Sequence, residues 1–170
     1  PCIQLLHCLE NEVKEGLSTL VDGFAVAEYL KKNNYDLFKI LTETKVRFRF
    51  VDKTIILENW GELIELDQEK RIKQVRYSTR LDYVPALEKT KLKKFYKARK
   101  LIANLYASKK FEIRFKLEKG DLLMMDNHRL LHGRTSYNSR EGKRYLKGCY
   151  IDHDSTEGKL RYLERKFRIK

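Results

Sequence analysis

The chain has 170 residues, of which 42% are hydrophobic and 11% aromatic, so it can form a packed core and is not expected to be disordered. Its net charge is +13, from 37 Lys and Arg against 24 Asp and Glu. Such a charge favours polyanions, but the lysines are spread along the whole chain, which argues against a nucleic-acid partner. No apolar run is long enough to cross a bilayer and no secretory leader is present, so we expect a cytoplasmic protein without a membrane partner.

The first half of the chain is predicted to contain short strands and two helices. The helices are expected over residues 24–32 and 37–41, where apolar side chains recur at helical spacing. Residues 45–51 alternate apolar and basic side chains, as in a half-buried strand. Further strands are expected over residues 3–9, 18–21, 54–57, 63–66 and 72–77, and Asn59-Trp60-Gly61 is expected to form a turn between two of them.

The second half contains the strongest helical pattern, over residues 89–107, where one face is apolar and lysines cover the other. The alternation over residues 111–117 predicts a strand, and residues 122–125 are apolar at every position, which predicts a strand buried on both faces. A strand over residues 144–151 and a basic helix over residues 158–170 complete the pattern. Many short strands with two substantial helices predict a single domain over residues 1–170, mainly β with flanking helices, such as a jelly roll.

Three cysteines occur, Cys2, Cys8 and Cys149, and no two of them form a Cys-x-x-Cys pair. This sparse, odd set predicts free thiols in a reducing compartment and argues against a zinc site built from cysteines.

Two residues near the C-terminus suggest chemistry. His132 lies in an apolar strand beside Gly133, where it can act as a metal ligand or as an ordinary packed histidine. Arg144 opens the next strand, after a polar turn. A guanidinium that faces a protein interior needs a partner such as a carboxylate, whereas a surface arginine at a strand end needs none.

Several segments, in the same order along the chain, resemble one enzyme group. The segments that carry the resemblance are residues 3–9, 21–28, 95–98, 126–134 and 148–150. On these segments the chain is similar to the C-terminal part of the iron(II)/2-oxoglutarate dioxygenases of the γ-butyrobetaine dioxygenase and trimethyllysine dioxygenase group, within the taurine dioxygenase-like superfamily.

The resemblance implies a double-stranded β-helix (a clavaminate synthase-like jelly roll) that binds Fe(II) and 2-oxoglutarate, with O₂ as co-substrate. His132 matches the distal histidine of a facial triad of two histidines and one carboxylate. Arg144 matches the arginine that binds the 2-oxoglutarate carboxylate, and Thr19 matches a hydroxyl that assists it. Tyr150 matches an aromatic wall for a trimethylammonium substrate, which suits a cation over a tyrosine face. The group also implies a homodimer.

The chain departs from the group's pattern at three places. The proximal His-x-Asp ligands are expected just before the first strand, and the chain begins at Pro1, so we expect an N-terminally truncated domain that is inactive by itself. His128 stands where relatives usually carry Trp, and a hydrogen-bonded packing role is expected for it. Ser78 and Thr79 stand where relatives often carry an Asn pair that binds the substrate carboxylate.

The expected function of the intact protein is hydroxylation of an aliphatic C–H bond in a small acid that carries a trimethylammonium group, such as γ-butyrobetaine. The hydroxylation is coupled to decarboxylation of 2-oxoglutarate to succinate. Two alternatives remain open from the sequence: a non-catalytic jelly-roll module that binds a small molecule, and a basic nucleic-acid-binding domain.

Overall fold

The computed structural model of the chain describes residues 2–168 and divides them into two compact units. Unit 1 contains residues 2–19, 114–128 and 133–168, and unit 2 contains residues 20–113 and 129–132. The expectation that the whole chain forms a single domain stays a prediction.

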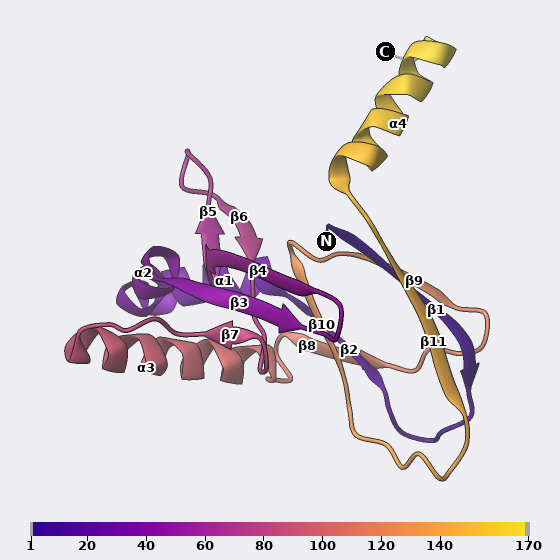
Figure 1. The fold of residues 1–170 in the computed structure, drawn as a ribbon, viewed down its shortest axis with the longest axis horizontal. Helices are drawn as coiled ribbons and strands as arrows, with labels where there is room; N and C mark the ends of the chain where they lie inside the picture. Colours follow the sequence, from indigo (N-terminus) through magenta and orange to yellow (C-terminus); the bar gives the residue numbers. More distant parts are fainter. Residues whose placement is uncertain (1, 169–170) are drawn as a thin grey trace. The chain divides into compact units, whose positions relative to one another are not determined.

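A three-stranded antiparallel sheet is the main element of unit 1. Its central strand β1 (Ile3–Asn11) pairs with β9 (Leu122–Asp126) on one side and with β11 (Arg144–Ile151) on the other, as Figure 1 shows. Ile3 pairs with both Asp126 and Ile151, so the two outer strands reach the same level at this end of the sheet. Helix α4 (His153–Phe167) follows β11 and has no buried residue.

A second three-stranded sheet has the order β10-β2-β8. Its strands are β2 (Ser18–Asp22), β8 (Glu112–Phe115) and β10 (Leu130–Arg134). The chain passes from one unit to the other within each of these three strands.

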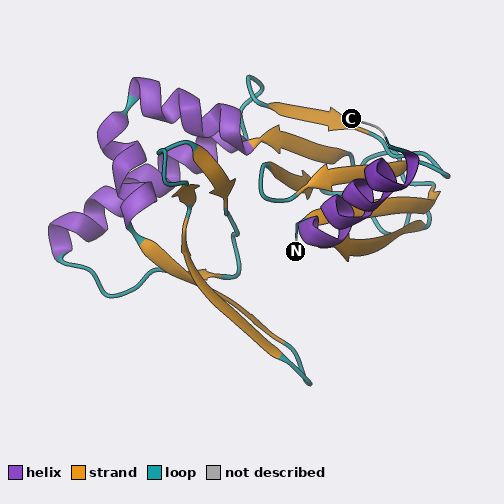
Figure 2. Cartoon of the chain, turned by 90° about the horizontal axis from the view of Figure 1, so that it is seen from above, coloured by secondary structure: helices purple, strands orange, loops and turns teal. Residues whose placement is uncertain are grey.

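Unit 2 contains three helices, α1 (Gly23–Asn33), α2 (Tyr35–Glu43) and α3 (Lys89–Tyr106), which lie together beside its strands (Figure 2). Helix α1 begins at the predicted place because the Asp22 carboxylate accepts hydrogen bonds from the backbone N–H groups of Phe24 and Ala25, at 3.0 and 3.3 Å. The apolar faces of all three helices form one hydrophobic core, in which Leu30, Leu41 and Phe95 are fully buried.

The remaining strands of unit 2 form two small sheets. One has the order β4-β3-β7, from β3 (Lys45–Val51), β4 (Ile56–Glu62) and the two-residue β7 (Asp82–Tyr83). The other pairs β5 (Ile64–Leu66) with β6 (Ile72–Val75). The strand predicted over residues 45–51 has the bounds of β3, and the helix predicted over residues 89–107 is one residue longer than α3.

Three sequence expectations are wrong in detail. Asn59, Trp60 and Gly61 do not turn but lie within β4, where they pair with Phe48, Arg47 and Val46. Residues 122–125 are not buried on both faces: Met125 is buried, whereas Leu122 and Met124 are 59% and 66% exposed. The terminal helix begins at residue 153 instead of 158, and residues 169–170 of that prediction lie outside the described part of the chain.

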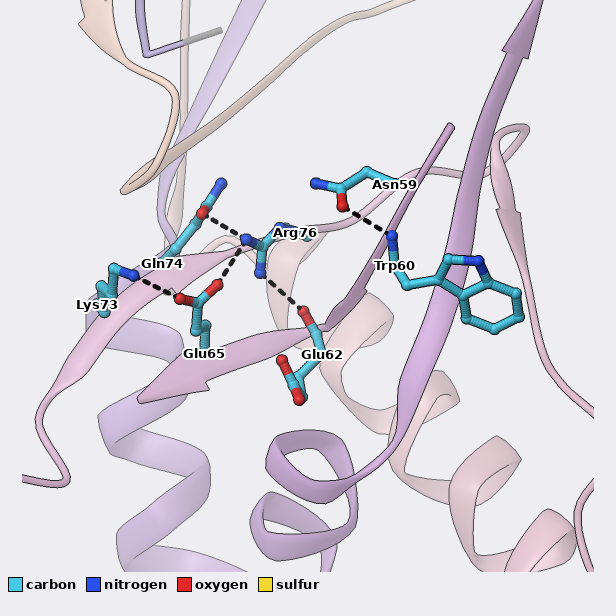
Figure 3. Close-up of polar contacts among 7 residues, drawn as sticks. All are labelled: Asn59, Trp60, Glu62, Glu65, Lys73, Gln74 and Arg76. Carbon is cyan, nitrogen blue, oxygen red and sulfur yellow. Dashed lines mark hydrogen bonds and ion pairs between the residues drawn. The ribbon is translucent and has the colours of Figure 1, made fainter. Parts of the chain in front are cut away.

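A polar network around Arg76 lies next to Gly61, the last residue of the Asn-Trp-Gly segment (Figure 3). The Arg76 guanidinium donates to Glu65 at 2.5 Å, to Gln74 at 2.7 Å and to the Glu62 carbonyl at 3.4 Å. A Cβ at residue 61 would lie 3.1 Å from the same guanidinium, so Gly61 makes room for it. Gly61 therefore allows the Arg76 side chain to approach the backbone closely, and the pairing of β4 with β3 overrides the tendency of glycine to form a turn.

Candidate functional site

Arg144, the predicted carboxylate-binding residue, lies at the first position of β11 in unit 1 and is half-buried. Its Nε atom is buried and has no hydrogen-bond partner among the described residues. Burial lowers the pKa of its guanidinium, and the positive charge of Arg134 lowers it further. A buried guanidinium nitrogen in a positive environment is a natural place for a carboxylate, because a charge-assisted hydrogen bond there offsets the cost of desolvation.

Tyr137 places the two arginines near each other in unit 1. The guanidinium carbons of Arg134 and Arg144 lie 4.3 and 5.7 Å from the centre of its ring. The ring packs on the backbone of Gly16, where a Cβ would lie 3.2 Å from the Tyr137 Cβ. Neither the exposed Arg134 nor the half-buried Tyr137 is singled out by the sequence. Arg134 is the last residue of β10 and Tyr137 lies on the connection to β11, so only the fold of this connection brings them to Arg144.

Thr19, predicted to assist the carboxylate, is half-buried on β2, in the part that belongs to unit 1. A Cβ at residue 133 would lie 3.0 Å from the Thr19 hydroxyl oxygen, so Gly133 allows the two strands to approach at this hydroxyl. Two hydrogen bonds between neighbouring residues keep these two segments together. The Thr135 N–H donates to the Leu17 carbonyl at 2.9 Å, and the Leu17 N–H donates to the Thr135 hydroxyl at 2.9 Å.

His132, the predicted metal ligand, lies on β10 in unit 2. The residue is exposed, yet partial desolvation by the surrounding protein lowers the pKa of its imidazole. A lower pKa favours the neutral imidazole, which is the form that binds metals. Arg144 lies in unit 1, so the expected convergence of His132 and Arg144 in one interior stays a prediction.

Tyr150, the predicted substrate contact, lies on β11 and is 59% exposed. It shares a face of that strand with Arg144, since side chains alternate along a strand and the two residues are six apart. At about 3.3 Å per residue they are separated by about 20 Å. One small ligand therefore cannot contact both residues, and the predicted substrate role of Tyr150 stays a prediction.

Ser78 and Thr79, where relatives often carry an Asn pair, belong to unit 2. The Ser78 hydroxyl accepts the backbone N–H groups of Arg80 and Leu81, at 3.2 and 3.0 Å. Arg99 donates to the Ser78 carbonyl at 3.1 Å and to both carboxylate oxygens of Asp82. Ser78 therefore helps to shape this loop.

The family assignment follows from a model that matches most of the chain. Residues 1–150 match the model described as "Taurine catabolism dioxygenase TauD, TfdA family". The chain belongs to this family. The matched segment includes Thr19, His132, Arg144 and Tyr150, so the four residues that the resemblance singled out all fall inside the family domain.

Curated relatives in the TauD, TfdA family agree with the expected group. The chain is 36% identical to the human γ-butyrobetaine dioxygenase over 171 residues, which cover 98% of this chain and 44% of the relative. It is 29% identical to the mitochondrial trimethyllysine dioxygenase of Bos taurus, over 96% of this chain and 40% of the relative. The chain thus spans less than half the length of these relatives.

A solved structure shows that the fold is shared. The chain is similar to a crystal structure of asparagine oxygenase in complex with Fe(II), a hydroxyasparagine and succinate, with a TM-score of 0.68 at 15% identity. The match covers 89% of this chain and 45% of that one. At this identity the likeness concerns the fold alone, and it confirms the predicted fold class, mainly β strands with flanking helices in the jelly-roll manner of this family.

The three cysteines are as the sequence predicts in the described part of the chain. Cys2, Cys8 and Cys149 are free thiols there, as expected. Burial raises the pKa of the Cys8 thiol and keeps it protonated. None of the described helices is both long enough and apolar enough to cross a membrane.

Proposed function

We propose that this chain is the C-terminal part of the catalytic domain of an Fe(II)- and 2-oxoglutarate-dependent dioxygenase. The observation that carries the proposal is the buried Nε of Arg144, which has no hydrogen-bond partner among the described residues and lies near the positive charge of Arg134, in a chain of the TauD, TfdA family. The asparagine oxygenase of the same fold was solved with Fe(II) and succinate, and succinate is what remains of 2-oxoglutarate after loss of CO₂.

The residues present fit these cofactors. Arg144 would bind the distal carboxylate of 2-oxoglutarate through its guanidinium, with the Thr19 hydroxyl as a second donor and Arg134 as a further positive charge. His132 would supply one imidazole to the metal, and the rest of a facial triad would come from outside the described residues. When bound, Fe(II) supplies the chemistry that couples decarboxylation of 2-oxoglutarate to hydroxylation of an aliphatic C–H bond.

For the substrate, we propose a small acid that carries a trimethylammonium group, such as γ-butyrobetaine. The human relative carries that name, and Tyr150 on β11 offers an exposed aromatic face to a cation. We also propose that the intact protein forms a homodimer in the cytoplasm, and that the chain by itself is inactive because it carries one of three metal ligands.

Arg144 provides the decisive test in the intact protein. Arg144→Ala should raise the KM for 2-oxoglutarate about 10- to 150-fold, which corresponds to losing about 1.5–3 kcal/mol from a hydrogen bond to a charged group. Arg144→Lys should recover part of this loss through charge alone. Succinate release at varied 2-oxoglutarate concentration is the measurement.

One further variant serves as a control, and another tests the proposed metal ligand. Arg140→Ala removes an exposed arginine from the same β10–β11 connection and should leave the KM unchanged. His132→Ala should abolish succinate release. If His132→Ala remains active, or if Arg144→Ala keeps the normal KM, the site assignment is wrong and a non-catalytic binding module becomes the better description.

A further inference from the structure

Three metal-binding side chains of unit 1, which the proposed dioxygenase chemistry does not use, lie together. The ligand atoms of Cys2, His128 and His153 are all within 4.8 Å of one another, and all three residues are half-buried. The two imidazole rings are tilted by 58°, with their centres 5.1 Å apart. In a tetrahedral zinc site with metal–ligand bonds of about 2.0–2.3 Å, ligand atoms are roughly 3.3–3.8 Å apart, so a shift of about 1 Å would close this group around an ion.

The register of the β11-β1-β9 sheet brings these residues together. Ile3 pairs with Asp126 on β9 and with Ile151 on β11. Cys2 is the residue before Ile3, and His128 and His153 each lie two residues beyond the paired positions of the outer strands. All three therefore emerge at one end of the sheet, which explains how residues so distant in sequence meet.

Nearby hydrogen bonds hold two of the three backbones in place. The Asn127 N–H donates to the Cys2 carbonyl at 2.7 Å, and the Asn127 side chain donates to the buried Gln4 at 3.0 Å. The His128 N–H donates to the Asp126 carboxylate at 2.8 Å. Such bonds orient metal ligands before the ion arrives, which reduces the entropy lost on binding.

We propose that Cys2, His128 and His153 form a zinc site, separate from the dioxygenase centre. One thiolate and two imidazoles are a ligand set that Zn²⁺ favours, with water or the Asp126 carboxylate in the fourth position. The Asp126 Oδ1 atom lies 3.5 Å from the His153 Nε2 atom. On binding, the Cys2 thiol releases its proton to solvent, and the ion ties the start of β1 to the β9–β10 turn and to the start of α4.

The charges of the site are compatible with a cation. His153 is the first residue of α4, where the positive end of the helix dipole opposes a metal ion. The carboxylates of Asp152 and Asp154 at the same helix end, and of Asp126 on β9, offset this unfavourable effect. The negative charge of the Cys2 thiolate neutralises one of the two positive charges of the bound ion. The proposed site differs from the expectation of no zinc site, which followed from cysteine spacing alone and considered neither histidine.

The test measures zinc bound by the intact protein after equilibrium dialysis against Zn²⁺. Cys2→Ser, His128→Ala and His153→Ala should each lose one equivalent of zinc, with affinity for that equivalent falling at least about 100-fold, since even indirect partners of a metal contribute about 10- to 100-fold. Cys149→Ser and His7→Ala remove an exposed cysteine and an exposed histidine from the same sheet and should retain it.

Cobalt separates this site from the dioxygenase centre. Co²⁺ should give a thiolate-to-metal charge-transfer band that disappears in Cys2→Ser and remains in both Cys149→Ser and His132→Ala, because the proposed iron site has no thiolate. Circular dichroism of the metal-free variants should match the parent, which shows that they fold. If the parent gives no such band, or if the three variants bind as much zinc as the parent, the proposal is overturned, whatever becomes of the dioxygenase assignment.

Discussion

The two units of the molecule are stabilised in different ways. Unit 2 has a continuous hydrophobic core in which three helices pack around fully buried residues such as Phe95 and Leu41. In unit 1 the buried apolar residues are few, namely Cys8, Val13, Leu117 and Met125 among those described, and Leu122 and Met124 are exposed. Most of the polar residues with proposed roles are in unit 1, namely Arg144, Thr19 and the Cys2-His128-His153 group, whereas His132 is in unit 2. The unit with the weaker core thus carries most of the candidate chemistry, as expected where residues serve ligands instead of packing.

The largest expected effect lies in the core of unit 2. Phe95→Ala should lower the free energy of unfolding by about 3–5 kcal/mol, because the substitution removes a fully buried ring and leaves a cavity. Chemical denaturation measures the change. The exposed Lys97→Ala on the same helix should stay within about 0.5 kcal/mol of the parent. A Met125→Ala loss as large as that of Phe95→Ala would show that unit 1 has an equally important core, and the contrast between the units would fail.

A smaller effect is expected at the start of α1. Asp22→Ala should cost about 0.5–2 kcal/mol, because the carboxylate caps the helix and also receives the Arg129 guanidinium at 2.6 Å. Asn34→Ala is the matched control, since Asn34 precedes α2 but its side chain makes no capping hydrogen bond. Equal losses in the two variants would show that capping by Asp22 is not what stabilises α1.

The same carboxylate gives unit 2 a dependence on pH. The hydrogen bond from Arg129 lowers the pKa of Asp22 below its ordinary value of 3.8. Its stabilising effect is therefore complete above that value and is lost as the pH falls through the folded-state pKa. The difference in unfolding free energy between the parent and Asp22→Asn should shrink on acidification. A difference that stays constant down to acid-denaturing conditions would contradict this origin.

The smallest expected effect lies in unit 1, at the contact of Gly133 with Thr19. Gly133→Ala places a Cβ 3.0 Å from the Thr19 hydroxyl, a close contact that should destabilise the protein by about 0.5–1 kcal/mol. In a Thr19→Ala background the contact disappears, and the same change should be neutral or slightly stabilising, because alanine has less freedom than glycine in the unfolded chain. A double-mutant cycle measures the coupling, and additive effects would show that the hydroxyl does not face Gly133.

Much of the local structure could be read from the sequence. Strand β3 and helix α3 were predicted nearly to the residue because their apolar periods are long and uninterrupted. The sequence also determined the family, since short motifs in fixed order carry the resemblance, and these motifs pointed to His132 and Arg144. Asn59, Trp60 and Gly61 were mispredicted because local turn preference is weaker than seven cross-strand pairs with β3.

Only the tertiary structure decided which side chains meet. Tyr137 lies between Arg134 and Arg144 because the connection from β10 folds back on Gly16, and no spacing in the sequence indicates this contact. Cys2, His128 and His153 come together because β1 pairs with both β9 and β11 at Ile3. Periodicity reports the faces of single strands and helices, whereas the grouping of distant residues depends on strand register, which is set by the packing of the whole sheet.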